Sequence, residues 1–163
     1  MARWLALDVG EARIGVAISD ATGFLASPYM TLHVTRDESQ TLKAIQHMIE
    51  ETGTEGLVVG LPISLDGEIH SQGKRVQAFT KRLKEHVAVP IVFWDERLST
   101  VEAERLLDVR GEAELGRRYK ITGGRKHNQT KRRRRKQEVD ALAAAVILQE
   151  YLDAQMSKTR GTE

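Results

Sequence analysis

The sequence predicts an α/β fold built on a mixed sheet, in which an antiparallel three-strand meander is followed by parallel strands with crossover helices. Three observations favour this fold. The first strand candidates are joined by short connections suited to hairpins, and residues 14–18 show the two-residue alternation of a strand, which is typical of antiparallel strands. The later strand candidates are short apolar runs, which are typical of buried parallel strands. Stretches of helical periodicity lie between those runs, and parallel neighbours require such crossovers.

The meander occupies the first 34 residues. Residues 3–9 read as a buried strand, residues 14–18 alternate as a second strand, and residues 10–13 form a connection suited to a hairpin. A third strand is expected over residues 29–34, after a turn rich in Gly, Ser and Pro. Gly15 suits tight backbone or the close approach of a ligand.

Helices and parallel strands alternate over the rest of the chain. The first helix is expected to begin at Asp37, which has capping-box spacing with Gln40, and to end near Gly53. The remaining expected elements are a strand over 56–60, a helix that contains Val76, Phe79, Leu83 and Val87, a strand over 91–94, a helix that opens at Ser99 and ends near Gly111, and a last helix over about 138–154.

Length and composition fit one domain over residues 1–154, followed by a tail over residues 155–163 that we expect to be disordered. The chain has 163 residues and no cysteine, which excludes a disulfide framework, a thiolate metal site and a cysteine nucleophile. No run of apolar residues is long enough for a membrane span, and the N-terminus lacks the pattern of a signal peptide. We therefore expect a cytoplasmic protein without a membrane partner.

The charge of the chain is distributed unevenly. Residues 116–137 hold 11 of the 25 Lys and Arg residues and no Asp or Glu, which leaves 14 basic residues against 23 acidic ones elsewhere. Because like charges repel, we expect a flexible basic loop at about 111–137. A basic segment on an acidic body indicates a polyanionic partner, with nucleic acid the commonest; the alternative is a solubilising run.

Four carboxylates lie at the ends of predicted strands or helices. Asp8 ends the first strand, Asp95 and Glu96 end the strand over 91–94, and Asp140 opens the last helix. Parallel sheets place ligands at the carboxyl ends of their strands, so these acids can meet there. Converging carboxylates repel one another unless a cation lies between them, which indicates Mg²⁺ (or Mn²⁺) and phosphodiester chemistry. The alternative is that each acid faces solvent or caps an element.

Strand alternation distinguishes the two neighbouring acids. Asp95 shares a face with Phe93, whereas Glu96 shares the opposite face with Trp94. Both cannot point into one site unless the strand has ended, so they are competing candidates for the second metal ligand. The five histidines lack the spacing of metal ligands, which argues against zinc or histidine-based catalysis.

Basic residues near these acids are candidate phosphate contacts. Arg13, Lys74 and Arg97 could bind phosphate groups, although surface Arg and Lys are usually only solvated. The basic run before Asp140 could follow a nucleic-acid backbone with salt-dependent affinity, and its lack of aromatic residues means that base stacking is not implied. This run consists of Lys131, Arg132, Arg133, Arg134, Arg135 and Lys136.

Four linked motifs resemble those of the YqgF, or RuvX, family. They occur in the family's order over roughly residues 3–152, and four linked motifs are specific where a single one would not be. The motifs are ALDVG at 6–10 with RIGVAISD at 13–20, VVGLP at 58–62, DERLST at 95–100, and DALAA at 140–144 with IL at 147–148.

The resemblance implies a ribonuclease-H-like fold and a metal-dependent nuclease. The family is similar to Holliday-junction resolvases but is associated mainly with maturation of the 5′ end of pre-16S rRNA. By motif, Asp8, Glu96 and Asp140 would be the catalytic acids, with Asp95 as a neighbouring metal ligand. Resolvases of the RuvC type carry an acid at the end of the central strand, where this chain has residues 60–62, Gly-Leu-Pro. Resolvase activity is therefore not assumed.

Several functions are compatible with the sequence. The leading one is a nuclease that acts on structured RNA, such as pre-16S rRNA. The second is resolution of DNA junctions, usually carried out by symmetric dimers; this chain is expected to be a monomer or a homodimer. The third is a non-catalytic RNA-binding assembly factor without metal-dependent turnover. Actin-like ATPases also carry an Asp-x-Gly turn after a strand, as at residues 8–10 here. They need two domains with this turn around the nucleotide, and this chain has room for one.

Overall fold

A computed structural model of the chain describes residues 2–64, 66–95 and 125–161. The predicted helix after Ser99, the first part of the expected basic loop, and Glu96 and Arg97 lie outside the described residues. The described elements are β1 (Trp4–Val9), β2 (Arg13–Ser19), β3 (Ala26–His33), α1 (Glu38–Thr52), β4 (Gly56–Leu61), α2 (Ser71–Lys84), β5 (Ile91–Asp95) and α4 (Arg125–Arg160).

The five described strands form one mixed sheet in the order β3-β2-β1-β4-β5, so that β1 lies at its centre. The pairs β1–β2 and β2–β3 are antiparallel, whereas β1–β4 and β4–β5 are parallel. This topology confirms the predicted meander followed by parallel strands. The carboxyl ends of the parallel strands β1, β4 and β5 therefore lie along the same side of the sheet, here called its carboxyl edge. The candidate site described below lies at this carboxyl edge.

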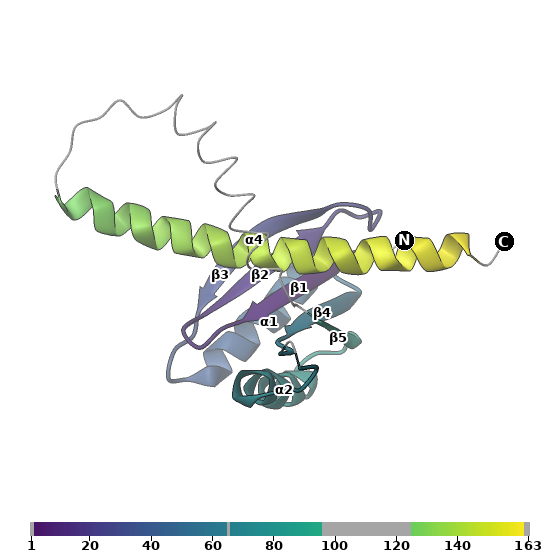
Figure 1. The fold of residues 1–163 in the computed structure, drawn as a ribbon, viewed down its shortest axis with the longest axis horizontal. Coiled ribbons are helices and arrows are strands. Elements are labelled where there is room, and N and C mark those ends of the chain that lie inside the picture. Colours follow the sequence, from purple (N-terminus) through teal and green to yellow (C-terminus); the bar gives the residue numbers. More distant parts are fainter. Residues whose placement is uncertain (1, 65, 96–124, 162–163) are drawn as a thin grey trace, which may run out of the picture.

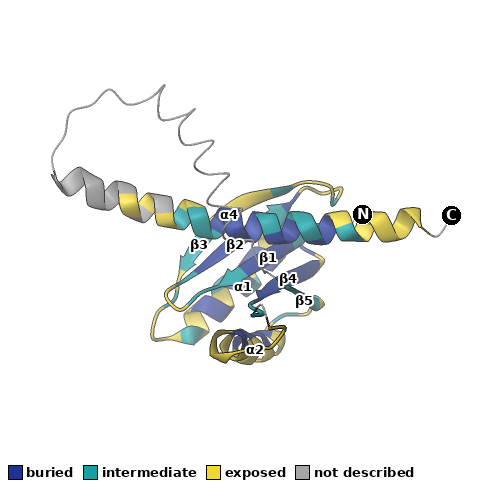
Figure 2. Ribbon diagram, in the orientation of Figure 1, coloured by how far each residue is buried: buried dark blue, intermediate teal, exposed yellow. Residues whose placement is uncertain are grey.

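Helices cover both faces of the sheet (Figure 1). Leu5 and Leu7 of β1 belong to the core on the side of α1 and α2, while Ala6 between them belongs to the core on the side of α4. This alternation follows from the two-residue period of a strand. The centre of α4 is buried against the sheet, and its C-terminal end is exposed (Figure 2).

Local capping explains the bounds of α1. The Asp37 carboxylate accepts a hydrogen bond from the Ser39 backbone N at 3.1 Å, and Gly53 ends the helix in the left-handed region, at φ 67°. The sequence predicts both ends of this helix correctly. The side-chain cap bonds the second residue after Asp37 rather than Gln40 at the third, as a capping box would.

The turn before β3 is tighter than the sequence indicates. The Asp20 carboxylate accepts hydrogen bonds from the Thr22 hydroxyl and from two backbone N–H groups of the turn, and these bonds lower the pKa of Asp20 to about 2. The strand consequently begins at Ala26 rather than at residue 29. It includes Pro28, which an edge strand tolerates because its outer N–H groups need no partner in the sheet.

The predicted bounds of the last helix are wrong. Residues 125–137 were expected in a flexible loop and residues 155–163 in a disordered tail, yet α4 is one helix of 36 residues from Arg125 to Arg160. This stretch contains no Gly or Pro, and Arg, Lys, Gln and Ala are strong helix formers. Repulsion between neighbouring like charges costs only tenths of a kcal/mol per pair, which is too little to unfold such a sequence.

Among the described helices, none is long and apolar enough to cross a membrane.

Candidate active site at the carboxyl edge of the sheet

Asp8 lies near the end of the central strand, on the face of the sheet that α4 covers. Leu5 and Leu7 point to the other face, so alternation places Ala6 and Asp8 together on the α4 face. The strand partner of Asp8 in the antiparallel pair is Gly15 of β2. A segment that packs on Gly15 therefore lies next to Asp8, because the two residues are paired on adjacent strands.

The backbone of α4 packs directly on Gly15. A Cβ atom placed at Gly15 would lie 2.0 Å from the Asp140 carbonyl oxygen and 2.9 Å from the Ala141 nitrogen. Only glycine leaves room for this contact, because real Cβ atoms do not approach backbone atoms so closely. The close approach expected at Gly15 is thus made by a helix of the chain itself. It brings Asp140 beside Asp8, although the two are far apart in the sequence.

Asp140 lies in the interior of α4, not at its beginning. The helix starts at Arg125, about four turns earlier at 3.6 residues per turn, so Asp140 is not a first-turn acid that stabilises the helix dipole. It shares a helix face with Ala144 and Ile147, both fully buried against the sheet. The helix-dipole alternative for this carboxylate is therefore removed. Its side chain is 25% exposed, so it remains accessible from the edge of the sheet.

Arg13 forms an ion pair with Asp140. The Arg13 Nε donates to Asp140 Oδ2 at 2.6 Å, with the two side chains 31% and 25% exposed. Arg13, Gly15 and Ala17 alternate on the α4 face of β2, which explains why the guanidinium meets the helix. Arg13 was predicted to contact phosphate; in the structure its partner is the carboxylate of the candidate site.

Asp95 lies on the other face of its strand. Val92 and Trp94 pack on the α4 side of β5, and Ile91 packs on the side of α1 and α2. Alternation places Asp95 with Ile91, and thus opposite to the face of Asp8. Within the described part of the chain, Asp8, Asp95 and Asp140 do not form a group whose ligand atoms all lie within 4.8 Å of one another.

The N-terminal part of α4 extends past the edge of the sheet that carries Asp8. Gln149 accepts a hydrogen bond from the Ala26 backbone N at the start of β3, and the Thr31 hydroxyl donates to the Gln137 carbonyl near its end. The helix thus runs against β3 in the opposite direction. Because β1 and β3 are both antiparallel to β2, the residues before Gln137 leave the sheet at the carboxyl end of β1 (Figure 1).

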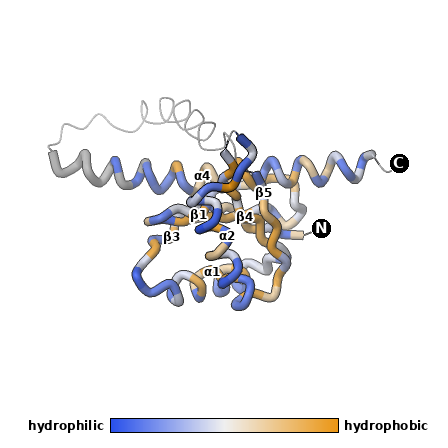
Figure 3. The backbone as a smooth tube through the Cα atoms, turned by 60° about the horizontal axis from the view of Figure 1, so that its bottom comes forward, coloured by the Kyte–Doolittle hydropathy of each residue, from blue (hydrophilic) through white to orange (hydrophobic). Residues whose placement is uncertain are grey.

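We call residues 125–136 of α4 the basic arm. Arg132, Arg134 and Lys136 are exposed, and the described part of the arm is hydrophilic in Figure 3. The side chains at 131, 133 and 135 lie outside the described residues. Lys74, the other predicted phosphate contact, is an exposed residue in the first turn of α2 and therefore belongs to the opposite layer.

A second group of possible ligands lies in the connection between β4 and α2. Asp66, Glu68 and His70 have ligand atoms within 4.8 Å of one another, and all three residues are exposed. A hydrogen bond from the Glu68 backbone N lowers the pKa of Asp66. The sequence reasoning missed this group, although its D-x-E-x-H spacing was visible. Exposed acids of this kind are common without an ion, so the group does not define a metal site.

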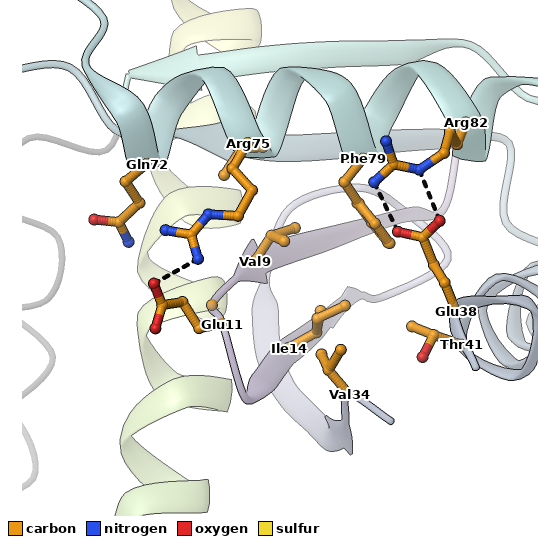
Figure 4. Close-up of a pocket in the computed structure, with 12 residues that line it drawn as sticks. Val9, Glu11, Ile14, Val34, Glu38, Thr41, Gln72, Arg75, Phe79 and Arg82 are labelled. Carbon is orange, nitrogen blue, oxygen red and sulfur yellow. Dashed lines mark hydrogen bonds and ion pairs between the residues drawn. The ribbon is translucent and has the colours of Figure 1, made fainter. Parts of the chain in front are cut away.

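A pocket of about 140 Å³ lies between α2, α1 and the β1–β2 turn, on the face of the sheet opposite to Asp140 (Figure 4). Arg75 bonds Glu11 of that turn at 2.5 Å, and Arg82 forms a two-pronged pair with Glu38 of α1 at 2.7 and 2.8 Å. Apolar side chains line the pocket between these pairs. The pairs join α2 to its neighbours, and the pocket is separate from the carboxylate site.

The groups at Asp8 and Asp140 suit a hard divalent cation. Carboxylate oxygens are the ligands that Mg²⁺ and Mn²⁺ prefer in proteins, and the site has no sulfur or imidazole among its described residues. Asp140 already holds a cationic partner, the Arg13 guanidinium, as the charge of two adjacent acids requires. The donor set therefore fits the ion that the sequence predicts.

Known proteins similar to this chain agree with the motifs. Residues 2–123 match the model of the RuvX family, described as a Holliday junction resolvase. A protein of Caldanaerobacter subterraneus subsp. tengcongensis named "Putative pre-16S rRNA nuclease" is 39% identical over 153 residues, which cover 94% of this chain and 97% of that protein. A protein of the same name from Desulforudis audaxviator is 40% identical over 155 residues, with 95% and 96% covered.

Solved structures with a similar fold include two resolvases. The chain superposes on Thermus thermophilus RuvC in complex with a Holliday junction substrate with a TM-score of 0.55 and 12% identity, over 96% of this chain and 97% of that one. Fowlpox virus resolvase in complex with Holliday junction DNA gives a TM-score of 0.53 and 9% identity, with 94% and 98% covered. At such identities the likeness shows the fold alone. It confirms the expected ribonuclease-H-like architecture.

Proposed function

This chain belongs to the RuvX family, and on that premise we propose that it is a divalent-metal-dependent nuclease that processes the 5′ end of pre-16S rRNA. The observation that carries the proposal is the contact of α4 with Gly15, which brings Asp140 beside Asp8 at the end of the central strand. The relatives named for pre-16S rRNA support RNA as the substrate.

Asp8 and Asp140 would hold Mg²⁺ (or Mn²⁺), with Glu96 as the proposed third acid. Glu96 follows Asp95, and if the alternation of Val92 and Trp94 toward α4 continues, it falls on the face of Asp8. The same alternation makes Asp95 the weaker candidate. When bound, the ion would supply an activated water and stabilise the charge that develops on the phosphate. The carboxylates would position that ion, and the buried strands of Ala6 and Ala17 would keep these carboxylates on rigid backbone.

The basic arm would hold the nucleic-acid backbone next to these acids. Its exposed residues Arg132, Arg134 and Lys136 precede Asp140 on one continuous helix that leaves the sheet at the edge of the site. Cations so placed attract phosphates without reading bases, which suits a substrate recognised by shape. Lys74 of α2 and Arg97, which lies outside the described residues, are proposed as further phosphate contacts.

Purified protein offered two substrates tests this function directly. We expect Mg²⁺-dependent cleavage of a 5′-extended pre-16S leader, and at least about tenfold slower cleavage of a four-way DNA junction at equal concentration and salt. A mature-length 16S fragment is the matched control and should stay intact. The family description favours junction resolution as the second function. Preferred, symmetric cleavage of the junction would establish that function instead, and tight RNA binding without cleavage would indicate an assembly factor.

The salt dependence of binding tests the basic arm. Replacing Arg132, Arg134 and Lys136 together by alanine should weaken RNA binding and reduce the slope of log K against log[salt] by about 2 to 3. The slope falls because each RNA phosphate that loses its protein contact keeps its counterions on binding. Filter binding across a series of KCl concentrations measures the slope. Alanine at Lys81 and Lys84, exposed cations of α2, removes two positive charges elsewhere and should change the slope little. An unchanged slope in the triple variant would remove the arm from the interface.

A further inference from the structure

The ion pair between Arg13 and Asp140 occupies one oxygen of a carboxylate that the proposed metal site needs. Arg13 Nε lies 2.6 Å from Asp140 Oδ2, a short, charge-assisted hydrogen bond between two side chains that are about one-third and one-quarter exposed. An ion bound by Asp140 and the adjacent Asp8 would have to share this carboxylate with the guanidinium or displace it. Two cations on one carboxylate repel each other at this range.

The backbone holds Arg13 in place. Its carbonyl oxygen accepts a hydrogen bond from the Gly10 backbone N at 2.9 Å, and a Cβ at Gly10 would lie 2.7 Å from that oxygen. Arg13 also opens β2, where it is paired in register with His33 of β3. The Cα of Arg13 therefore cannot retreat when an ion arrives, and only the flexible end of its side chain can leave Asp140.

We propose that Arg13 is a positioning residue and the resident counter-cation of Asp140, which a divalent ion must displace in order to load the site. In the absence of metal the guanidinium neutralises Asp140 beside Asp8 and fixes the orientation of its carboxylate. When the ion binds, the guanidinium is released at the edge of the sheet, where a substrate phosphate is its natural new partner. Arg13 thereby lowers the affinity of the free protein for metal. This inference rests on the proposed metal-dependent function.

Manganese binding to the free protein tests the inference without any substrate. Titration with Mn²⁺, followed by the electron paramagnetic resonance signal of the free ion, should give a dissociation constant about tenfold lower for Arg13→Gln than for the unmodified chain, because one positive charge beside the ion is gone. Arg13→Lys keeps the charge and should remain within about twofold of the unmodified chain. Arg82→Gln removes a guanidinium from another carboxylate pair, that with Glu38, and should leave Mn²⁺ binding unchanged.

The outcomes separate this inference from the function on which it rests. Equal or weaker binding in a folded Arg13→Gln variant, judged by its circular dichroism and melting curve, overturns the role of Arg13 and leaves the metal site standing. If the charge-retaining Arg13→Lys variant binds Mn²⁺ as tightly as Arg13→Gln, the electrostatic role of Arg13 is likewise wrong. Binding that persists in Asp8→Asn would place the ion elsewhere, and this result would count against the proposed active site itself.

Discussion

Replacing Asp8 by asparagine should lower the rate of RNA cleavage by about 10³-fold, the equivalent of ~4 kcal/mol of transition-state stabilisation. The amide keeps the size and hydrogen-bonding capacity of the side chain but removes the negative charge that would hold the ion on the central strand. Because Asp8 is not part of the buried core, the fold should survive. Single-turnover cleavage of the pre-16S leader at saturating protein measures the chemical step apart from binding.

Asp153→Asn is the matched control for this variant. Asp153 is an exposed acid on the C-terminal part of α4, where it accepts a hydrogen bond from Gln149. Its replacement should leave the cleavage rate unchanged. If Asp8→Asn and Asp153→Asn cleave at the same rate, Asp8 takes no part in the reaction.

Replacing Gly15 by alanine should destabilise the protein by ~3 kcal/mol and lower its melting temperature by ~10 °C. The added Cβ would overlap the Asp140 carbonyl, and backbone cannot move aside as a flexible side chain would. To relieve the overlap, α4 must lift away from β2, which carries Asp140 away from Asp8. We therefore expect cleavage to be lost even at temperatures where the variant is folded. Urea denaturation and cleavage assays well below the melting temperature measure the two effects separately.

Gly161→Ala provides the comparison for the same chemical change. The nearest atoms to a Cβ at Gly161 lie at 3.7 and 3.8 Å, which is ordinary van der Waals contact, so this variant should melt within about 1 °C of the unmodified chain. If Gly15→Ala proves as stable and as active as Gly161→Ala, the close packing of α4 on β2 does not exist in solution.

The parts of the fold that obey simple periods were predictable. Strand alternation in β1, β2 and β5 is a local property, and it correctly assigned Asp95 and Trp94 to opposite faces. The end of α1 at Gly53 and the buried strand β4 were equally evident, because a glycine after a helical stretch and a short, wholly apolar run are specific local signals. Signals of this local kind are also sufficient to place Asp8 at the carboxyl end of its strand.

What could not be predicted depends on contacts between distant segments. Gly15 indicated a close approach, but no rule of sequence says that the partner is the Asp140 backbone rather than a ligand. The pairing of Arg13 with Asp140 follows from that contact and was equally hidden. The start of α4 is hidden for a different reason: a run of like charges predicts a flexible loop, but the helix propensity of Arg and Lys outweighs their mutual repulsion.

The continuity of α4 has a consequence for where the chain would cut. At ~1.5 Å per residue, Arg132 and Asp140 are held ~12 Å apart along one rigid rod, and each residue added between them would turn the basic arm by ~100° about the helix axis. The exposed cations of the arm and the Asp140 carboxylate are thus fixed relative to each other in both distance and rotation about the helix axis. If the arm binds the substrate backbone as proposed, the same phosphodiester would be presented to the acids each time, because the number of residues along the helix sets the spacing.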